Sequence, residues 1–97
     1  MADDEFSLRK AAERAAQAQA LLENEILVGT FADIRQAYIG AWLATQPRDD
    51  EGRQMAWLAV KNLDKVREHL ERVVTDGKIA LTTLELNEAL APRKKRA

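Results

Sequence analysis

The sequence contains no cysteine, and this absence excludes disulfide bonds, thiolate metal sites and a cysteine nucleophile. It also contains no long apolar run. The chain turns acidic at Asp3, whereas a secretory signal needs a basic start followed by an apolar stretch. We therefore expect a cytoplasmic protein that makes no contact with a membrane.

Neither sign of charge is in excess, since 15 basic residues stand against 16 acidic ones. No overall field therefore attracts nucleic acid or an anionic membrane. The exception is local, because the chain ends with four adjacent cations: Arg93, Lys94, Lys95 and Arg96. Such a tail can neutralise phosphates nonspecifically, so DNA is a candidate partner, although most charge runs only keep a chain soluble. No aromatic residue interrupts the run, which argues against base stacking.

Residues that could carry chemistry are also scarce. His69 is the only histidine, and the positions one helical step away, Lys65 and Arg72, offer neither a second metal ligand nor an orienting carboxylate. The Glu-x-x-His pairs of dimetal bundles are missing. The four glycines lie far apart, so there is no phosphate-binding loop. We expect no catalytic, cofactor or metal site, no small-molecule substrate, and hence no enzyme.

Patterns typical of helices fill most of the chain. Ser7 is the first residue suited to an N-cap, and six alanines follow it between residues 11 and 20. The next apolar residues recur at steps of three or four, which places them on one helical face. They are Phe31, Ile34, Tyr38 and Trp42. We expect one helix over residues 7–46, ended by Pro47, with a kink at Gly29-Thr30 as the alternative.

A second amphipathic pattern follows the proline. Its first turn is acidic at residues 49–51, which favours a helix N-terminus. Its apolar positions at helical spacing are Met55, Leu58, Leu63, Val66, Leu70, Val73 and Val74. This pattern predicts a helix over residues 50–76, with Gly77 as a left-handed C-cap. Residues 78–82 alternate apolar and polar and suit a short strand or a linker, after which a capping box starts a brief helix over residues 83–91.

The predicted fold class is all-α, an antiparallel hairpin of two long helices with a short C-terminal helical appendage. Residues 7–91 form the single domain, between an acidic head of residues 1–6, expected to be disordered, and a flexible basic tail of residues 92–97. The hairpin pairs Phe31 and Ile34 with Leu63 and Val66 as its central layer. The alanine-rich stretch then overhangs its partner helix. So small a core predicts help from self-association or from a partner.

Two kinds of residue are candidates for a partner interface. Small residues let another helix approach closely, which singles out Ala12 and Ala16 in the alanine-rich stretch and Gly40 beside the aromatic stripe. Gly40 is equally explained as a tolerated surface glycine. Trp57 lies off the apolar stripe of the second helix, and an outward tryptophan beside a turn is suited to anchor an interface. The alternative for Trp57 is burial beneath the alanine-rich face of another copy.

The stretch from Phe31 to Trp42, together with residues 53–57, 66–70 and 77–80, resembles a group of short bacteriophage and prophage proteins encoded among head and DNA-packaging genes. The similarity extends over residues 20–85 and consists of a helix-packing pattern, so it carries no functional residues. It implies a phage context without naming an activity, in the cytoplasm of a bacterial host, with association with the virion as an alternative location. Small terminase subunits, which form rings through a helical hairpin and hold DNA with basic elements, are a looser comparison. This chain has no room for their helix-turn-helix domain before the hairpin.

The sequence therefore favours a non-enzymatic assembly or interaction protein, which self-associates as a homo-oligomer or binds another protein through helical surfaces. The alternative is a DNA-packaging component of the small-terminase type, which would use the basic C-terminal tail for nonspecific contact with DNA. The two hypotheses differ in the partner, protein or nucleic acid, and in the part of the chain that binds it.

Overall fold

The structure is a computed structural model that describes residues 4–91. Within that range the chain is entirely helical, with three helices and no strand: α1 (Glu5–Leu22), α2 (Glu25–Leu43) and α3 (Asp50–Leu90). The prediction of an all-α fold is confirmed. The predicted order of two long helices followed by a short helical appendage is wrong. The first predicted helix is divided into α1 and α2, and the second predicted helix and the appendage form one continuous helix, α3.

The first predicted helix, over residues 7–46, is interrupted at Glu23 and Asn24. The Asn24 side chain accepts a hydrogen bond from the Leu27 amide at 2.9 Å, so it caps α2, and asparagine is among the strongest N-cap residues. The break therefore lies before Gly29-Thr30, the kink considered from the sequence, and that pair is helical. The start also differs. Asp4 rather than Ser7 is the N-cap of α1, since its Oδ1 accepts from the Ser7 amide at 2.7 Å.

Helix α3 runs for 41 residues, straight through the segment where a C-cap, a strand or linker and a new helix were predicted. Gly77 is not a left-handed cap, because no glycine in residues 4–91 has a positive φ. The hydroxyls of Thr82 and Thr83 donate to the carbonyls of Lys78 and Ile79, at 3.0 and 2.9 Å, which satisfies them inside the helix instead of at an N-cap. The predicted helix over residues 83–91 is thus the end of α3.

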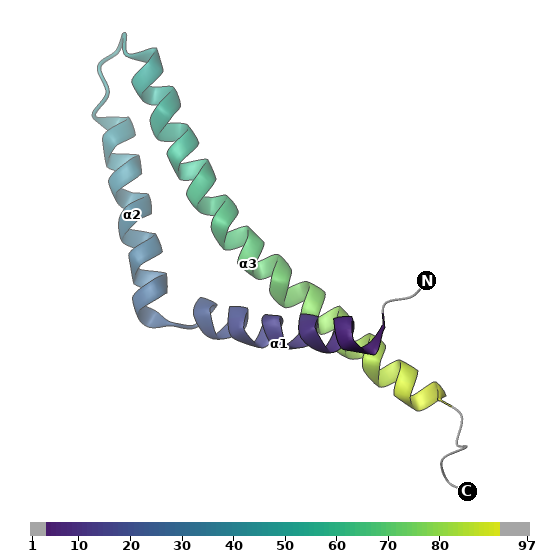
Figure 1. The fold of residues 1–97 in the computed structure, drawn as a ribbon. Coiled ribbons are helices and arrows are strands. Elements are labelled where there is room, and N and C mark those ends of the chain that lie inside the picture. Colours follow the sequence, from purple (N-terminus) through teal and green to yellow (C-terminus); the bar gives the residue numbers. More distant parts are fainter. Residues whose placement is uncertain (1–3, 92–97) are drawn as a thin grey trace, which may run out of the picture.

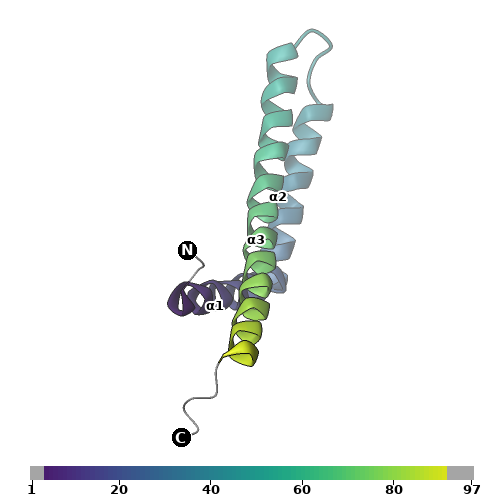
Figure 2. The ribbon, with the colours of Figure 1, turned by 90° about the vertical axis from the view of Figure 1, so that its right-hand side faces the viewer.

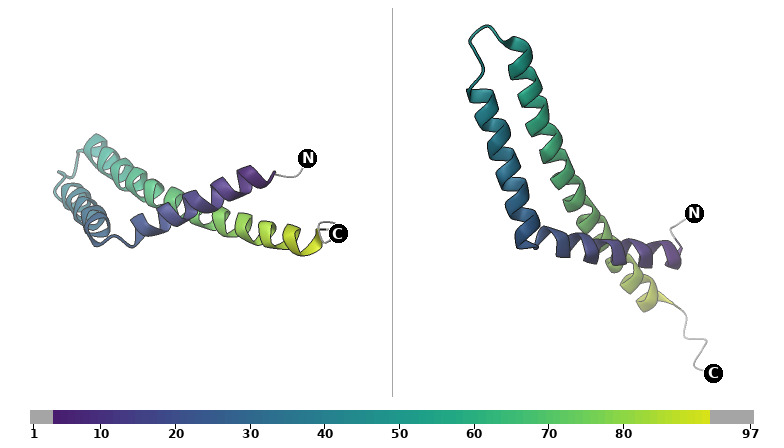
Figure 3. Two further views of the ribbon diagram at one scale, coloured as in Figure 1. Left: turned by 60° about the horizontal axis from the view of Figure 1, so that its bottom comes forward. Right: turned by 60° about the vertical axis from the view of Figure 1, so that its left-hand side comes forward.

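The three helices form an open frame rather than a compact bundle. A loop over residues 44–49 joins α2 to α3, which run in opposite directions and diverge away from the loop, while α1 crosses the C-terminal half of α3 (Figures 1 and 3). Seen from the side, the frame is narrow (Figure 2). Its extents are 77 × 30 × 15 Å. The radius of gyration is 20.9 Å, whereas a compact chain of this length has about 12.5 Å.

The buried core sits where α1 crosses α3. The buried apolar residues of the described chain all belong to these two helices: Leu8, Ala15, Ala18, Val74 and Ala80. Gly77 is buried among them, and a Cβ added there would lie only 2.0 Å from the Ala15 Cβ. Small residues on both helices allow this close crossing. The alanine-rich stretch, predicted to overhang without a partner, therefore contributes two of the five core residues, Ala15 and Ala18.

The layer predicted as the core is not buried. Phe31 and Leu63 are half-buried between α2 and α3, whereas Ile34 and Val66 are 37% and 51% exposed. No residue of α2 is buried. The physical reason is that α2 faces α3 along one edge only and diverges from it (Figure 1). The chain turns at Asn24, and α1 then runs away from α2 to its crossing with α3.

Candidate interaction surface

The most unusual surface lies on what we call the α2–α3 arm, defined as α2 together with residues 50–70 of α3. Ten large apolar side chains of this arm are exposed: Ile26, Val28, Ile34, Tyr38, Trp42, Leu43, Met55, Trp57, Leu58 and Val66. Scattered apolar residues are normal on a protein surface, but so many large ones on two neighbouring helices indicate an interaction site. The arm is therefore the candidate functional site.

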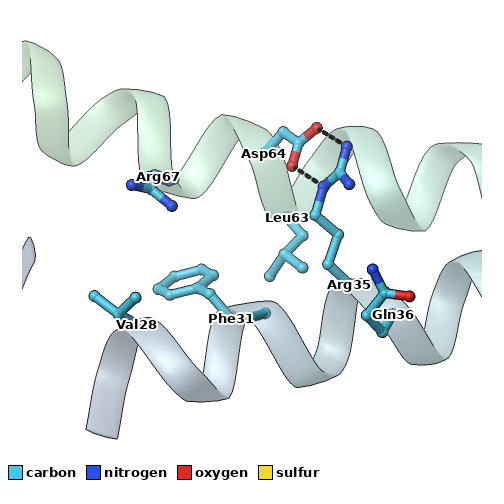
Figure 4. A pocket seen from close by; sticks show the side chains of 8 residues that line it. Val28, Phe31, Arg35, Gln36, Leu63, Asp64 and Arg67 are labelled. Carbon is cyan, nitrogen blue, oxygen red and sulfur yellow. Dashed lines mark hydrogen bonds and ion pairs between the residues drawn. The ribbon is translucent and has the colours of Figure 1, made fainter. Parts of the chain in front are cut away.

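One side of the arm carries charge. A shallow groove of about 320 Å³ runs between α2 and α3, and it is lined by Val28, Phe31, Ala32, Arg35, Gln36, Leu63, Asp64 and Arg67. In it the Arg35 Nε donates to Asp64 Oδ1 at 3.0 Å, the ion pair that joins the two helices (Figure 4). Arg67 lies on the same side of α3 (Figure 4), where it pairs with Glu71 at 3.4 Å. We call this the charged side.

The ion pair between α2 and α3 shifts the titration of both partners. The hydrogen bond from Arg35, and then its charge, hold the pKa of Asp64 below its usual value. The same hydrogen bond and the charge of Asp64 raise the pKa of Arg35. Both side chains remain substantially exposed to water, so the pair orients the helices more than it stabilises the fold.

The opposite side of the arm has no charge across its middle. Successive residues of a helix are rotated by about 100°. Side chains of α2 that lie about a quarter-turn from Phe31, in the direction opposite to Arg35, point to that side. So do side chains of α3 that lie about a quarter-turn from Leu63, in the direction opposite to Asp64. Across the middle of the arm they are Ile34, Ala37 and Ala41 of α2 and Met55, Asn62 and Val66 of α3, and all six are exposed. Thr30, Glu51 and His69 satisfy the same criterion at the two ends of the arm. We call the six residues across the middle the uncharged side.

Two of the residues singled out from the sequence lie on the arm but outside the uncharged side. Gly40 is exposed on the back of α2, and a Cβ added to it would meet no atom within 4 Å. Trp57 is 53% exposed, and the Lys61 Nζ lies 5.5 Å from its ring centroid, a cation–π contact on the charged side. Neither residue forms a contact within the chain that would explain it as core.

The other candidates lie far from the arm. Ala12 and Ala16 line a groove between α1 and α3, which also includes Val74 and Leu81, so the structure places them beside the crossing. The four cations from Arg93 to Arg96 lie outside the described residues, as do the rest of the predicted tail, residues 92–97, and the first three residues of the predicted head. The rest of that head, from Asp4 onward, caps and begins α1.

Residues 4–91 contain no group of three or more histidine, cysteine, aspartate or glutamate side chains placed to hold a metal ion. His69 is exposed on α3. Within the same residues, no helix is both long enough and apolar enough to cross a bilayer. No protein-family model, no curated protein and no solved structure matches the chain.

Proposed function

We propose that this chain is a non-enzymatic assembly protein, which binds a copy of itself or another protein through the apolar surface of its helices. In the assembled state α2 and α3 act as an antiparallel helical hairpin whose exposed stripe becomes the core of a larger bundle. The sequence resemblance centred on residues 31–42 supports a phage or prophage setting in a bacterial cytoplasm, where such a protein would take part in virion assembly.

The observation that carries this proposal is the amount of surface left uncovered, which includes many large apolar side chains. The chain exposes 7984 Å², whereas a compact protein of this mass exposes about 5,600 Å². Stable domains bury the apolar stripe of each helix against a second layer, whereas α2 contacts α3 along one edge only and has no buried residue. An isolated copy would thus leave water in contact with residues such as Trp42 and Met55, which are 44% and 65% exposed.

Thermal unfolding at several protein concentrations tests the proposal. Binding of a partner to the folded state stabilises it by mass action, so we expect the Tm of the purified chain to rise by several degrees between about 1 and 100 μM. Circular dichroism at 222 nm measures this directly. A cooperative Tm that is independent of concentration, in a chain that binds no apolar dye, would contradict the proposal.

The second candidate, a DNA-packaging component, rests on the four adjacent cations at the end of the sequence. Removing residues 92–97 would then flatten the dependence of log K on log salt by up to about four units per chain, because each neutralised phosphate contributes nearly one. The assembly proposal predicts instead weak binding to duplex DNA near physiological salt, and no change in mass when the tail is removed. Fluorescence anisotropy with labelled duplex DNA separates the two outcomes.

A further inference from the structure

We infer that the uncharged side of the α2–α3 arm is the contact surface between two copies of this chain. The inference rests on the proposed function and adds to it the partner, a second identical chain, and the surface, the six residues named above. Gly40 and Trp57, the arm residues first singled out as interface candidates, lie outside this contact.

The two sides of the arm differ in the cost of covering them. Covering the charged side would take Arg35, Asp64 and Arg67 out of water, and the desolvation of buried ions offsets most of what an ion pair contributes. The uncharged side includes two large aliphatic side chains and one methionine, namely Ile34, Val66 and Met55, with only Asn62 polar. Its burial therefore removes apolar surface from water with little opposing cost.

The exposed surface in excess of a compact chain is similar in size to the area that a stable dimer buries. The surface of one chain in excess of a compact chain is on the order of 2,000 Å², and obligate homodimers bury about 1,000 to 2,500 Å² of each partner. Two copies that each cover 1,000 Å² or more, as this class of interface requires, would account for a large part of that excess. A small ligand would cover too little of it.

None of the described helices covers the uncharged side, whose six residues are all exposed. Helix α1 is engaged with the C-terminal half of α3, where Ala15 is buried against Gly77. An apolar surface about three helical turns long needs a partner helix of similar length.

A second copy fits this surface by its chemistry. In a two-fold contact the same patch lies on both chains, so any charge near the axis would oppose its own kind. The uncharged side avoids that repulsion because its middle has no charge, and it offers its partner an apolar helix face of matching length. Two arms packed in this way form four helices, with Phe31 and Leu63 enclosed and the Arg35–Asp64 pair left in water on the outside.

The decisive experiment compares Val66→Lys with Trp57→Lys in the full chain. The two wild-type side chains have similar exposure, 51% and 53%, but lie on the uncharged and the charged side respectively. We expect Val66→Lys to weaken self-association by about 100-fold or more, because its ammonium would be buried without a partner, and Trp57→Lys to change it less than about fivefold. Light scattering over a dilution series measures both, with circular dichroism to check helicity.

A second pair of variants decides the matter if Val66→Lys fails to fold. The chain has no cysteine of its own, so Asn62→Cys and Lys61→Cys each introduce a single thiol on neighbouring positions. Asn62 lies near the middle of the uncharged side, where a two-fold axis brings a residue close to its own copy. Mild oxidation should therefore link Asn62→Cys into a covalent dimer at least tenfold faster than Lys61→Cys.

The possible results separate this inference from the proposed function. Equal cross-linking of the two thiols, or loss of self-association in Trp57→Lys alone, would overturn the uncharged side as the contact while leaving an assembly protein in place. Self-association that survives both lysine variants would do the same. A wild-type chain that stays monomeric would also overturn the inference, because its partner would then not be a second copy of the chain.

Discussion

Gly77→Ala is expected to lower the free energy of unfolding by about 2 kcal/mol, although alanine is the better helix former by about 1 kcal/mol. The new Cβ would lie 2.0 Å from the Ala15 Cβ and 2.8 Å from the backbone oxygen of Ala11. One of these atoms is a Cβ and the other a backbone oxygen, so neither can move by rotation of a side chain. Helix α1 must therefore shift as a whole. Thermal unfolding should show a fall in Tm of about 10 °C.

Gly29→Ala is the matched control, because it makes the same chemical change in the middle of a helix with nothing within 4 Å of the new Cβ. It should raise stability by up to about 1 kcal/mol through helix propensity alone. The two variants must be compared at one protein concentration, since self-association also changes the Tm. If Gly77→Ala were as stable as Gly29→Ala, the close crossing of α1 and α3 would be incorrect.

Leu8→Ala should produce a loss of comparable size, about 2 to 3 kcal/mol, because it removes the largest buried side chain of the crossing and leaves a cavity. Leu8 is 5% exposed, whereas Leu21, on the same helix, is 46% exposed. Leu21→Ala is therefore expected to cost less than about 1 kcal/mol. Chemical denaturation with urea measures both. Equal losses would mean that α1 contacts α3 through a different face.

The class of fold could be predicted because helical periodicity is a local property. The stripes of α2 and α3, the stop before α3 and the acidic start of α3 all follow from residues within one or two turns of each other. The break at Asn24 is local too, but its signal is one capping side chain inside an otherwise favourable pattern. The apolar register continues through this region and Gly29 is the more conspicuous helix breaker, so the sequence indicates Gly29 as the alternative break.

The crossing of α1 and α3 could not be predicted in the same way, because it depends on residues about 60 positions apart, such as Ala15 and Gly77. A glycine near the end of a helical pattern indicates a C-cap when considered alone. The signal that was missed is the spacing of small or slender residues on both helices: Ala11, Ala15 and Ala18 on one, Val74, Gly77 and Ala80 on the other. Such a pair of faces permits close packing without any cap.

The sequence predicts that the candidate site is a partner surface, but it does not predict which residues form that surface. A small core and an apolar surplus predict a partner surface, but size and aromaticity alone, which point to Gly40, Trp57, Ala12 and Ala16, do not say which side of the arm binds. The distinction between the two sides of the arm needs the relative rotation of α2 and α3. That rotation is fixed in the structure by contacts such as Arg35 with Asp64, 29 residues apart in the chain.

The most direct test of the account is the mass of the unmodified chain in solution. One chain has a mass of 10.9 kDa. Multi-angle light scattering during size-exclusion chromatography, at tens of micromolar protein, should give twice that value, falling toward a single chain only on strong dilution. A mass of one chain at every concentration, with intact helical circular dichroism, would contradict the claim that the exposed apolar arm is the surface of self-assembly.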